Sequence, residues 1–507
     1  MTCADPRPAV AARLRILRRL SAASAAALLL AASLAACSAP SGDTYPKLEE
    51  PNPSITLPGG ISATPTPAVA AVTLRILSHA PKASLDAVAE LYAGMSSGTL
   101  AREAGTDPGA LGATIPLEEL ARFAGTVVIE RVAPPATGDL ETELLAMAAS
   151  GILPDLFETE ALPRLADAGA LASLDDVPSV RAALQGGALL PAAVSACRIG
   201  DALLGLPRAA TTTVLFYNAD LLRAAGIEPA EVDAGLTVEA FAALLPRLTD
   251  PTRKQYALLS AAPLLPRLPA TRDGTLGWGT YRDGRFRFAS DAFSETAATL
   301  RSYVKSGWTT DALTADQRTK AFGNADPRAI GKVAFWIGDS TEAADWTAVA
   351  GIAAGVAPLP CLDRPAADLS VLALCVSATT RDLGSAVPFA AFLAADPDAL
   401  RLQSRIGFEP GAVPLSTDPS VWADAAVAAG PAVAPLFASF RDRLADAFVS
   451  GRTGVPGWTQ AVDASIGAYQ NRLLSGALSA AAAAGPMGDA AAAALAAARE
   501  ALAAPAG

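Results

Sequence analysis

The side chains that could catalyse a reaction are few and widely spaced. The chain of 507 residues contains a single histidine, His79, and no Gly-x-Ser-x-Gly motif. Serine–histidine and cysteine–histidine catalysis would both have to use that one residue. The sequence also lacks the glycine-rich phosphate-binding motifs and any cluster of His, Cys and carboxylates that suggests a metal site. We therefore predict no catalytic residue, no cofactor and no metal.

A pair of carboxylates could still hydrolyse glycosidic bonds, because such enzymes work with two acidic side chains. The candidates are Glu158, Glu160, Asp175 and Asp176. The chain contains 50 acidic residues, so pairs of this kind arise by chance and usually act as solvated charges or caps. An anchored glycoside-processing enzyme stays open as an alternative.

The composition favours a soluble, multidomain protein. The formal net charge is −11, and it becomes −15 without residues 1–36, which carry five Arg and one Asp. An acidic chain without a basic stripe is a poor partner for nucleic-acid phosphates. With 51% hydrophobic residues and this length, two or three domains with ample core are expected.

The N-terminal sequence has the pattern of an export signal. Four arginines between Arg13 and Arg19 precede an uncharged apolar stretch, residues 20–34, that is too short for an ordinary membrane span. The stretch ends in Leu34-Ala-Ala-Cys37, which resembles the bacterial lipobox. The resemblance implies a lipoprotein signal peptide over 1–36 and lipidation of Cys37. The mature protein would then be extracytoplasmic and anchored to the cell membrane through its acyl chains.

Residues 37–71 are rich in Pro, Ser and Thr and contain few large apolar side chains. Such a segment cannot form a packed core, so a flexible tether is expected.

The stretch from Gly205 to Ile227 combines a strand and a short helix. Residues 211–217 are all β-branched, aromatic or Leu, which is typical of a strand buried on both faces. Asn218 or Asp220 can cap the following helix, and Gly226 can end it in the left-handed conformation.

The sequence of this stretch resembles that of the extracellular solute-binding proteins of ABC transporters. The shared pattern is Gly-Leu-Pro, a strand ending in Tyr-Asn, a Leu-rich helix and then Ala-Gly-Ile. The similarity is to the sugar-binding family 1, which is maltose-binding-protein-like. Further similar motifs follow in the family's order from about Val72 to Leu502, with 94–125 as an insertion. They are Pro154-Asp-Leu-Phe157, Gly169-Ala-Leu, Thr237-Val-Glu-Ala-Phe241, Gly331-Lys-Val-Ala-Phe335, Val356-Ala-Pro-Leu-Pro360 and Gly407-Phe-Glu-Pro410.

The resemblance implies an α/β, two-lobed, type II periplasmic-binding-protein-like fold. Each lobe would be a mixed sheet flanked by helices, and about three hinge crossovers would join the lobes. We expect lobe 1 to comprise 72–210 and 361–409, and lobe 2 to comprise 211–360 and 410–507. The crossovers would lie at 205–227, 356–360 and 407–414.

Ligands of open α/β sheets bind beyond the carboxyl ends of the strands, which here places the site between the lobes near the crossovers. His79 follows the first strand, and either faces the cleft or is an ordinary loop histidine. Arg208 is either a cleft donor or a brace between lobes. The other candidates by position in the family pattern are Glu158, Thr159, Glu160, Asp339, Ser340, Phe408 and Glu409.

Sugar sites usually combine a flat aromatic platform with hydrogen-bonding carboxylates and amides. The family places a Trp just after a strand that corresponds to residues 331–335, whereas Trp336 here lies inside the strand. Trp278, between Gly277 and Gly279, is the alternative platform, although a packed core residue is an equal interpretation.

The resemblance implies a monomeric substrate-binding component of an ABC importer. It would capture a small solute, such as a sugar or polyol, by hinge closure and pass it to permease subunits. A degenerate surface adaptor or sensor is a further alternative.

Three cysteines remain after export, namely Cys197, Cys361 and Cys375. They form either one disulfide with one free thiol or three buried thiols.

Overall fold

The computed structural model describes residues 71–135, 140–407, 412–431, 433–441, 443 and 447–503. The predicted signal peptide, the tether and Cys37 lie outside these residues, as do Phe408 and Glu409. None of the helices in the described ranges is long and apolar enough to cross a membrane.

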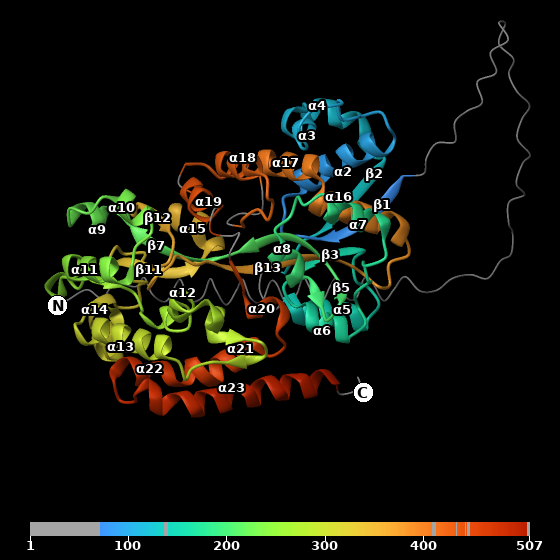
Figure 1. Cartoon of the computed structure of the whole chain (residues 1–507). Coiled ribbons are helices and arrows are strands. Elements are labelled where there is room, and N and C mark those ends of the chain that lie inside the picture. Colours follow the sequence, from blue (N-terminus) through green and yellow to red (C-terminus); the bar gives the residue numbers. More distant parts are fainter. Residues whose placement is uncertain are drawn as a thin grey trace, which may run out of the picture. The chain divides into compact units, whose positions relative to one another are not determined.

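The first sheet has six strands, in the order β14-β13-β3-β1-β2, with β6 also paired to β13 (Figure 1). Strand β1 is parallel to β2 and β3, whereas β13 is antiparallel to β3 and β6. The carboxyl ends of β1 and β3 therefore meet at one edge. The strands are β1 (Val72–Leu77), β2 (Val127–Val132), β3 (Leu156–Thr159), β6 (Leu206–Thr211), β13 (Asp368–Val376) and β14 (Phe448–Val449).

The second sheet has four strands in the order β12-β7-β11-β8. Strand β7 is antiparallel to both β11 and β12, and β11 is parallel to β8. Both sheets are thus mixed, as the sequence predicts. The strands are β7 (Thr213–Asn218), β8 (Tyr256–Leu258), β11 (Val333–Asp339) and β12 (Ala354–Ala357).

Helices pack around both sheets. Those around the first sheet include α2 (Lys82–Ser96), α5 (Leu140–Ala149), α6 (Leu162–Asp167), α7 (Pro178–Gln185), α8 (Pro191–Ala196), α16 (Leu383–Ala395) and α17 (Pro397–Ile406). Those of the second part include α9 (Ala219–Ala224), α11 (Val238–Leu248), α12 (Leu268–Arg272), α13 (Asp291–Lys305), α21 (Trp458–Val462), α22 (Ala468–Ser475) and α23 (Ala480–Ala503). Helices α18 (Pro419–Ala429) and α19 (Ala434–Arg441) follow α17, and α19 contacts β12.

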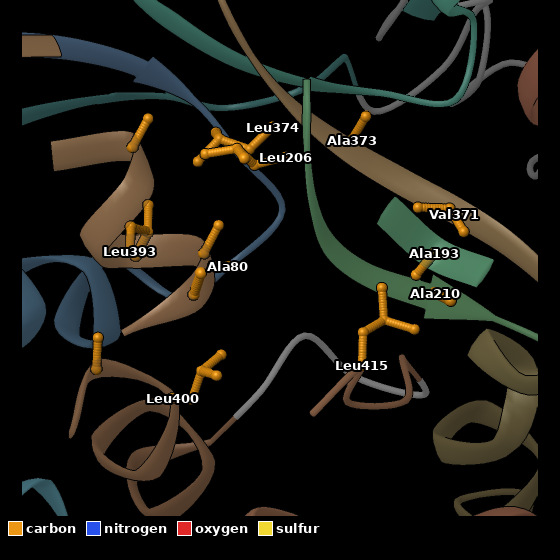
Figure 2. Packing of buried hydrophobic residues seen from close by; sticks show 14 of the residues in the cluster. Ala80, Ala193, Leu206, Ala210, Val371, Ala373, Leu374, Leu393, Leu400 and Leu415 are labelled. Atoms are coloured by element: carbon orange, nitrogen blue, oxygen red, sulfur yellow. The ribbon is translucent and has the colours of Figure 1, made fainter. Parts of the chain in front are cut away.

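The single strand predicted over 211–217 is divided in the structure, because Thr211 ends β6 and β7 begins at Thr213. Strand β7 is buried on both faces, which confirms that part of the prediction. Val214 and Phe216 belong to the core cluster that also contains the first sheet, whereas Leu215 and Tyr217 belong to a second cluster. Side chains alternate between the faces of a strand, so one strand serves two cores. In the first core, Leu206 of β6 lies beside Leu374 of β13, its partner in register (Figure 2).

The helix after β7 forms as its sequence indicates. The Asn218 side-chain oxygen accepts hydrogen bonds from the backbone N–H groups of Asp220 and Leu221, at 3.0 and 3.2 Å. Gly226 follows the helix in the left-handed conformation, with φ of 69°. The helix α9 therefore holds the end of β7 in a fixed place.

The chain passes between the sheets at several points. Thr212 alone separates β6 in the first sheet from β7 in the second, and residues 358–367 lead back from β12 to β13. Near the predicted third crossing, Val413 forms a β-bridge with Ala210 of β6. After β14 pairs with β13, the chain continues into α21, which packs on α23 in the second core. The lobe boundaries at 210 and 410 stay predictions.

The predicted insertion 94–125 contains two short helices, α3 (Ala110–Thr114) and α4 (Leu117–Leu120). Arg102 pairs with the carboxylates of Asp396 and Asp398 at the start of α17, so the segment is held against the first part of the protein.

All three cysteines of the described residues are buried and free, so the interpretation as three thiols is confirmed over a disulfide.

Candidate functional site

A cavity of about 1040 Å³ lies where the carboxyl edge of the first sheet, the crossing at Thr211 and the segment 452–460 meet. Polar and aromatic side chains of both parts of the protein line it. They include His79, Glu141, Thr159, Glu160, Arg164, Thr211, Asp339, Arg452, Trp458 and Gln460. Four of the predicted site residues, His79, Thr159, Glu160 and Asp339, are therefore brought together.

Glu158 lies behind this wall and does not line the cavity. Its side chain is 1% exposed and accepts hydrogen bonds from the Ser78 hydroxyl at 2.8 Å and the His79 backbone N–H at 2.9 Å. The Arg208 guanidinium, itself 3% exposed, lies 3.6 Å from the same carboxylate. Arg208 is thus a buried partner of Glu158 rather than a cavity donor.

Two opposing effects act on the pKa of the Glu158 carboxyl. Burial by itself would raise its pKa, because burial penalises the charged form. The hydrogen bonds from His79 and Ser78 and the charge of Arg208 outweigh burial and hold the pKa below the usual value. The ionised Glu158 therefore fixes the loop after β1, and His79 with it, before any ligand binds.

Glu160 is two residues further on and is differently placed. It lines the cavity, and its carboxylate makes no hydrogen bond or ion pair with any other residue that the structure describes. Burial raises the pKa of Glu160; the charge of Arg452 opposes the rise, and Asp339 adds to it. Because it lines the cavity without a partner there, the carboxyl group of Glu160 is available for hydrogen bonds with a bound molecule.

The crossing between the sheets carries a compact set of hydrogen bonds. Thr211 donates its hydroxyl to Asp339 at 3.0 Å, and the Thr212 backbone exchanges hydrogen bonds with buried Ser340. Asp368, at the start of β13, accepts from the Thr213 N–H at 2.7 Å and hydroxyl at 3.0 Å. The outgoing and returning crossings are thus tied together beside the cavity, and Ser340 acts inside this set rather than on the cavity surface.

Trp458, which the sequence reasoning missed, supplies the aromatic wall of the cavity. Its half-buried ring stacks on Phe286, with centroids 5.4 Å apart, and meets the edge of Tyr281 at 5.2 Å. The neighbouring Arg452 and Gln460 are exposed and also line the cavity. The turn Pro456-Gly457 before Trp458 was the available sequence signal, because it resembles the glycine context that singled out Trp278.

Trp278 does not lie in the cavity. It is 6% exposed, belongs to the second core and stacks on Phe448 with centroids 5.9 Å apart. Gly277 has φ of 73°, and a Cβ there would lie 2.0 Å from the Tyr281 carbonyl oxygen. The glycines are therefore required by a tight turn, and they do not expose the Trp278 ring to solvent.

The remaining charges of the cavity are partly paired. Arg164 and Glu141 form an ion pair at 3.0 Å on the side formed by α5 and α6. Asp175, one of the candidate hydrolytic carboxylates, lies elsewhere, where it accepts from Leu203 N–H and pairs with Arg198. No group of three or more potential metal ligands occurs within the described part of the chain.

The family model of bacterial extracellular solute-binding proteins matches residues 121–429, which is more than half of the chain. The chain belongs to this family. A search of the curated proteins gives no significant match to this solute-binding protein.

Solved structures share the fold of the solute-binding protein. The sugar-binding protein MalE from Xanthomonas citri is 18% identical, with 86% of this chain and 100% of that chain covered and a TM-score of 0.60. The cyclic α-maltosyl-1,6-maltose binding protein from Arthrobacter globiformis is 19% identical, with 84% and 99% covered and a TM-score of 0.59.

An ABC substrate-binding protein from Listeria monocytogenes in complex with cycloalternan is also similar. It is 16% identical, with 83% of this chain and 98% of that chain covered and a TM-score of 0.58. The likeness confirms the type II periplasmic-binding-protein fold expected from the sequence.

Proposed function

We propose that this extracellular solute-binding protein captures a carbohydrate in the cavity beside Trp458 and delivers it to the permease of an ABC importer. The observation that carries the proposal is the Trp458 ring on one side of the cavity and the Glu160 carboxylate among the residues lining it. A sugar offers apolar C–H faces to a ring and hydroxyls to carboxylates, so this combination suits it. The similar structures named above support the choice, because their names state sugars or oligosaccharides as ligands.

An oligosaccharide fits the cavity better than a single sugar. Pockets for small ligands measure about 300–1,000 Å³, and this cavity of about 1040 Å³ lies just above that range. Hydroxyls would be bound by Glu160, Thr159, His79 and Asp339, with Arg452 and Gln460 as donors on the other side. Glu158, Arg208 and Ser340 would act by holding these residues in place.

Binding would favour a closed arrangement of the two lobes, because a ligand that touches both gains contacts only when they approach. The crossing at Thr212, tied by Asp368 and Ser340, would be the point of bending. Lipidation of Cys37 and the tether 37–71 would keep a monomeric protein near the permease.

Tryptophan fluorescence tests the proposal. The full chain would be titrated with malto-oligosaccharides, monosaccharides, polyols and polyamines. The Trp458→Phe variant, titrated in the same way, would be the control. We expect a saturable emission change with at least one carbohydrate and its loss in Trp458→Phe. A folded protein that responds to none of these solutes, or equally in both forms, would contradict the proposal.

A further inference from the structure

Helix α23 continues beyond the core that holds it. The buried side chains Ala483, Met487, Ala491 and Leu495 are four residues apart and form one stripe against the second core. The next position of the stripe is the exposed Arg499, so the fully buried stripe ends at Leu495. The helix nevertheless extends to Ala503 (Figure 1).

The extended part of α23 borders the ligand cavity. Ala498 and Ala501, three residues apart and hence on one face of the helix, both line it. Helix α23 also contacts α6, whose Pro163 and Arg164 line the same cavity. The end of α23 therefore joins the second part of the protein to the first across one side of the cavity.

The helix also lies tightly against the segment that carries Trp458. Gly457 has φ of 73°, and a Cβ built there would lie 2.4 Å from the Cβ of Ala498. Only glycine at 457 and a small residue at 498 allow this approach. Helix α23 thus supports the turn from which the Trp458 ring projects.

We propose that the end of α23, residues 498–503, is a wall of the binding cavity, and that Ala498 and Ala501 set the length of ligand that the cavity admits. Small side chains at both positions leave the space open, while the helix backbone limits it and shields Trp458 from solvent. The part of the proposal that concerns ligand length rests on the proposed function; the wall itself does not.

The experiment compares three variants with the unaltered chain. The first ends after Ala497, which leaves the buried stripe through Leu495 intact. The second is Ala501→Phe, which fills space at the cavity. The third, Ala497→Phe, is the matched control, because Ala497 is exposed on the same helix and does not line the cavity.

The first measurement needs no ligand. Acrylamide quenching of Trp458 is obtained for each protein by difference from its Trp458→Phe counterpart. We expect the truncation to increase the quenching of Trp458 and Ala497→Phe to leave it unchanged. Unchanged quenching in a truncated protein that unfolds cooperatively would overturn the proposal. If the truncated protein does not fold, the comparison of Ala501→Phe with Ala497→Phe decides, and equal quenching in these two would overturn it.

The second measurement is calorimetry with the series from maltose to maltoheptaose. Ala501→Phe should lose about tenfold in affinity for the longer members, as blocked contacts at a binding interface do, and less for maltose. The truncation should weaken the dependence of affinity on length. The same ranking of lengths in all variants would overturn the length-setting role. Binding of no member, with increased quenching on truncation, would contradict the proposed sugar function and support the wall.

Discussion

The two sides of the cavity are built in different ways. On the side of the first sheet, Glu158 is fully buried and holds Ser78, His79 and Arg208 around it. On the other side, Trp458 rests on a stack of aromatic rings, and Arg452 and Gln460 are exposed. One side is fixed by a buried ionic network, whereas the other offers a prearranged ring with polar groups at its margin.

On our proposal, this difference separates residues that hold the site from residues that would contact a solute. The first kind should affect stability when replaced, and the second kind should affect binding. Pairs of neighbouring or chemically similar residues, one from each class, test this distinction.

The largest expected effect is that of Glu158→Ala on stability. The substitution removes a buried carboxylate that pairs with Arg208 and accepts hydrogen bonds from the Ser78 hydroxyl and the His79 N–H. Breaking a buried ionic network of this kind costs about 3–5 kcal/mol in the free energy of unfolding. Urea unfolding measures it. The matched control is Glu160→Ala, for which we expect a change below about 1 kcal/mol together with weaker sugar binding. Equal stability losses in the two variants would mean that the buried network does not hold the wall.

The second effect is that of Trp458→Ala on ligand affinity. Loss of an aromatic contact of this kind costs about 2 kcal/mol, or roughly 30-fold in Kd. The ring is half-buried and stacks on Phe286, so the loss in the free energy of unfolding should stay below that of Glu158→Ala.

Trp278→Phe is the control for the aromatic prediction. This ring is packed on Phe448 in the core, so its replacement should lower stability and leave the Kd within about twofold. A Kd that changes more with Trp278 than with Trp458 would place the ligand elsewhere.

A smaller effect is expected for Asp368→Asn, which removes the charge that accepts two hydrogen bonds from Thr213. An amide keeps one acceptor, so the unfolding free energy should fall by about 1–2 kcal/mol. Asp176→Asn, at a fully exposed carboxylate, should change it by less than about 0.5 kcal/mol. Differential scanning calorimetry on both variants checks the role of the crossing, and indistinguishable midpoints would argue against it.

The smallest effect is the pH dependence of stability. The ionisation of Glu158 should stabilise the folded protein, whereas the ionisation of Glu160 should destabilise it. The folded-state pKa of Glu158 is lowered from 4.5, so its stabilisation is present above that value and is lost as pH falls through the lowered pKa. The folded-state pKa of Glu160 is raised, so its ionisation in the folded protein lowers stability as pH rises from 4.5 through the raised pKa.

Glu160→Gln should therefore be slightly more stable than the unaltered protein at neutral pH, and equal to it in acid. Glu158→Gln should be less stable at neutral pH, and the deficit should shrink in acid. Urea midpoints measured from acid to neutral pH, on both sides of the ordinary glutamate pKa of about 4.3, check both signs. The same sign for both variants would contradict the different surroundings of the two carboxyls.

Much of the fold is predictable from the sequence because local patterns decide it. The burial of β7 and the Asn218 cap each depend on a few adjacent residues, and both are found as expected. The break at Thr212 between β6 and β7 is not visible in that local pattern. The placement of His79, Thr159 and Glu160 at strand ends follows from the general geometry of parallel strands.

The aromatic residue of the site could not be predicted in this way. Trp278 and Trp458 both stand next to glycine, and the choice between them depends on which turn reaches the cavity. The different roles of Glu158 and Glu160 were also hidden, because β3 ends at Thr159 and the alternation of the strand no longer governs residue 160. Tertiary packing decides both cases.

Calorimetric titration of one malto-oligosaccharide into the unaltered protein, Trp458→Ala and Glu160→Ala tests the central claim most directly. We predict one site per chain, with the affinity reduced about tenfold or more in each variant, since each loses a contact to the ligand. Equal affinities in all three proteins, or no binding of any carbohydrate to the folded chain, would contradict the assignment of this cavity as the solute site.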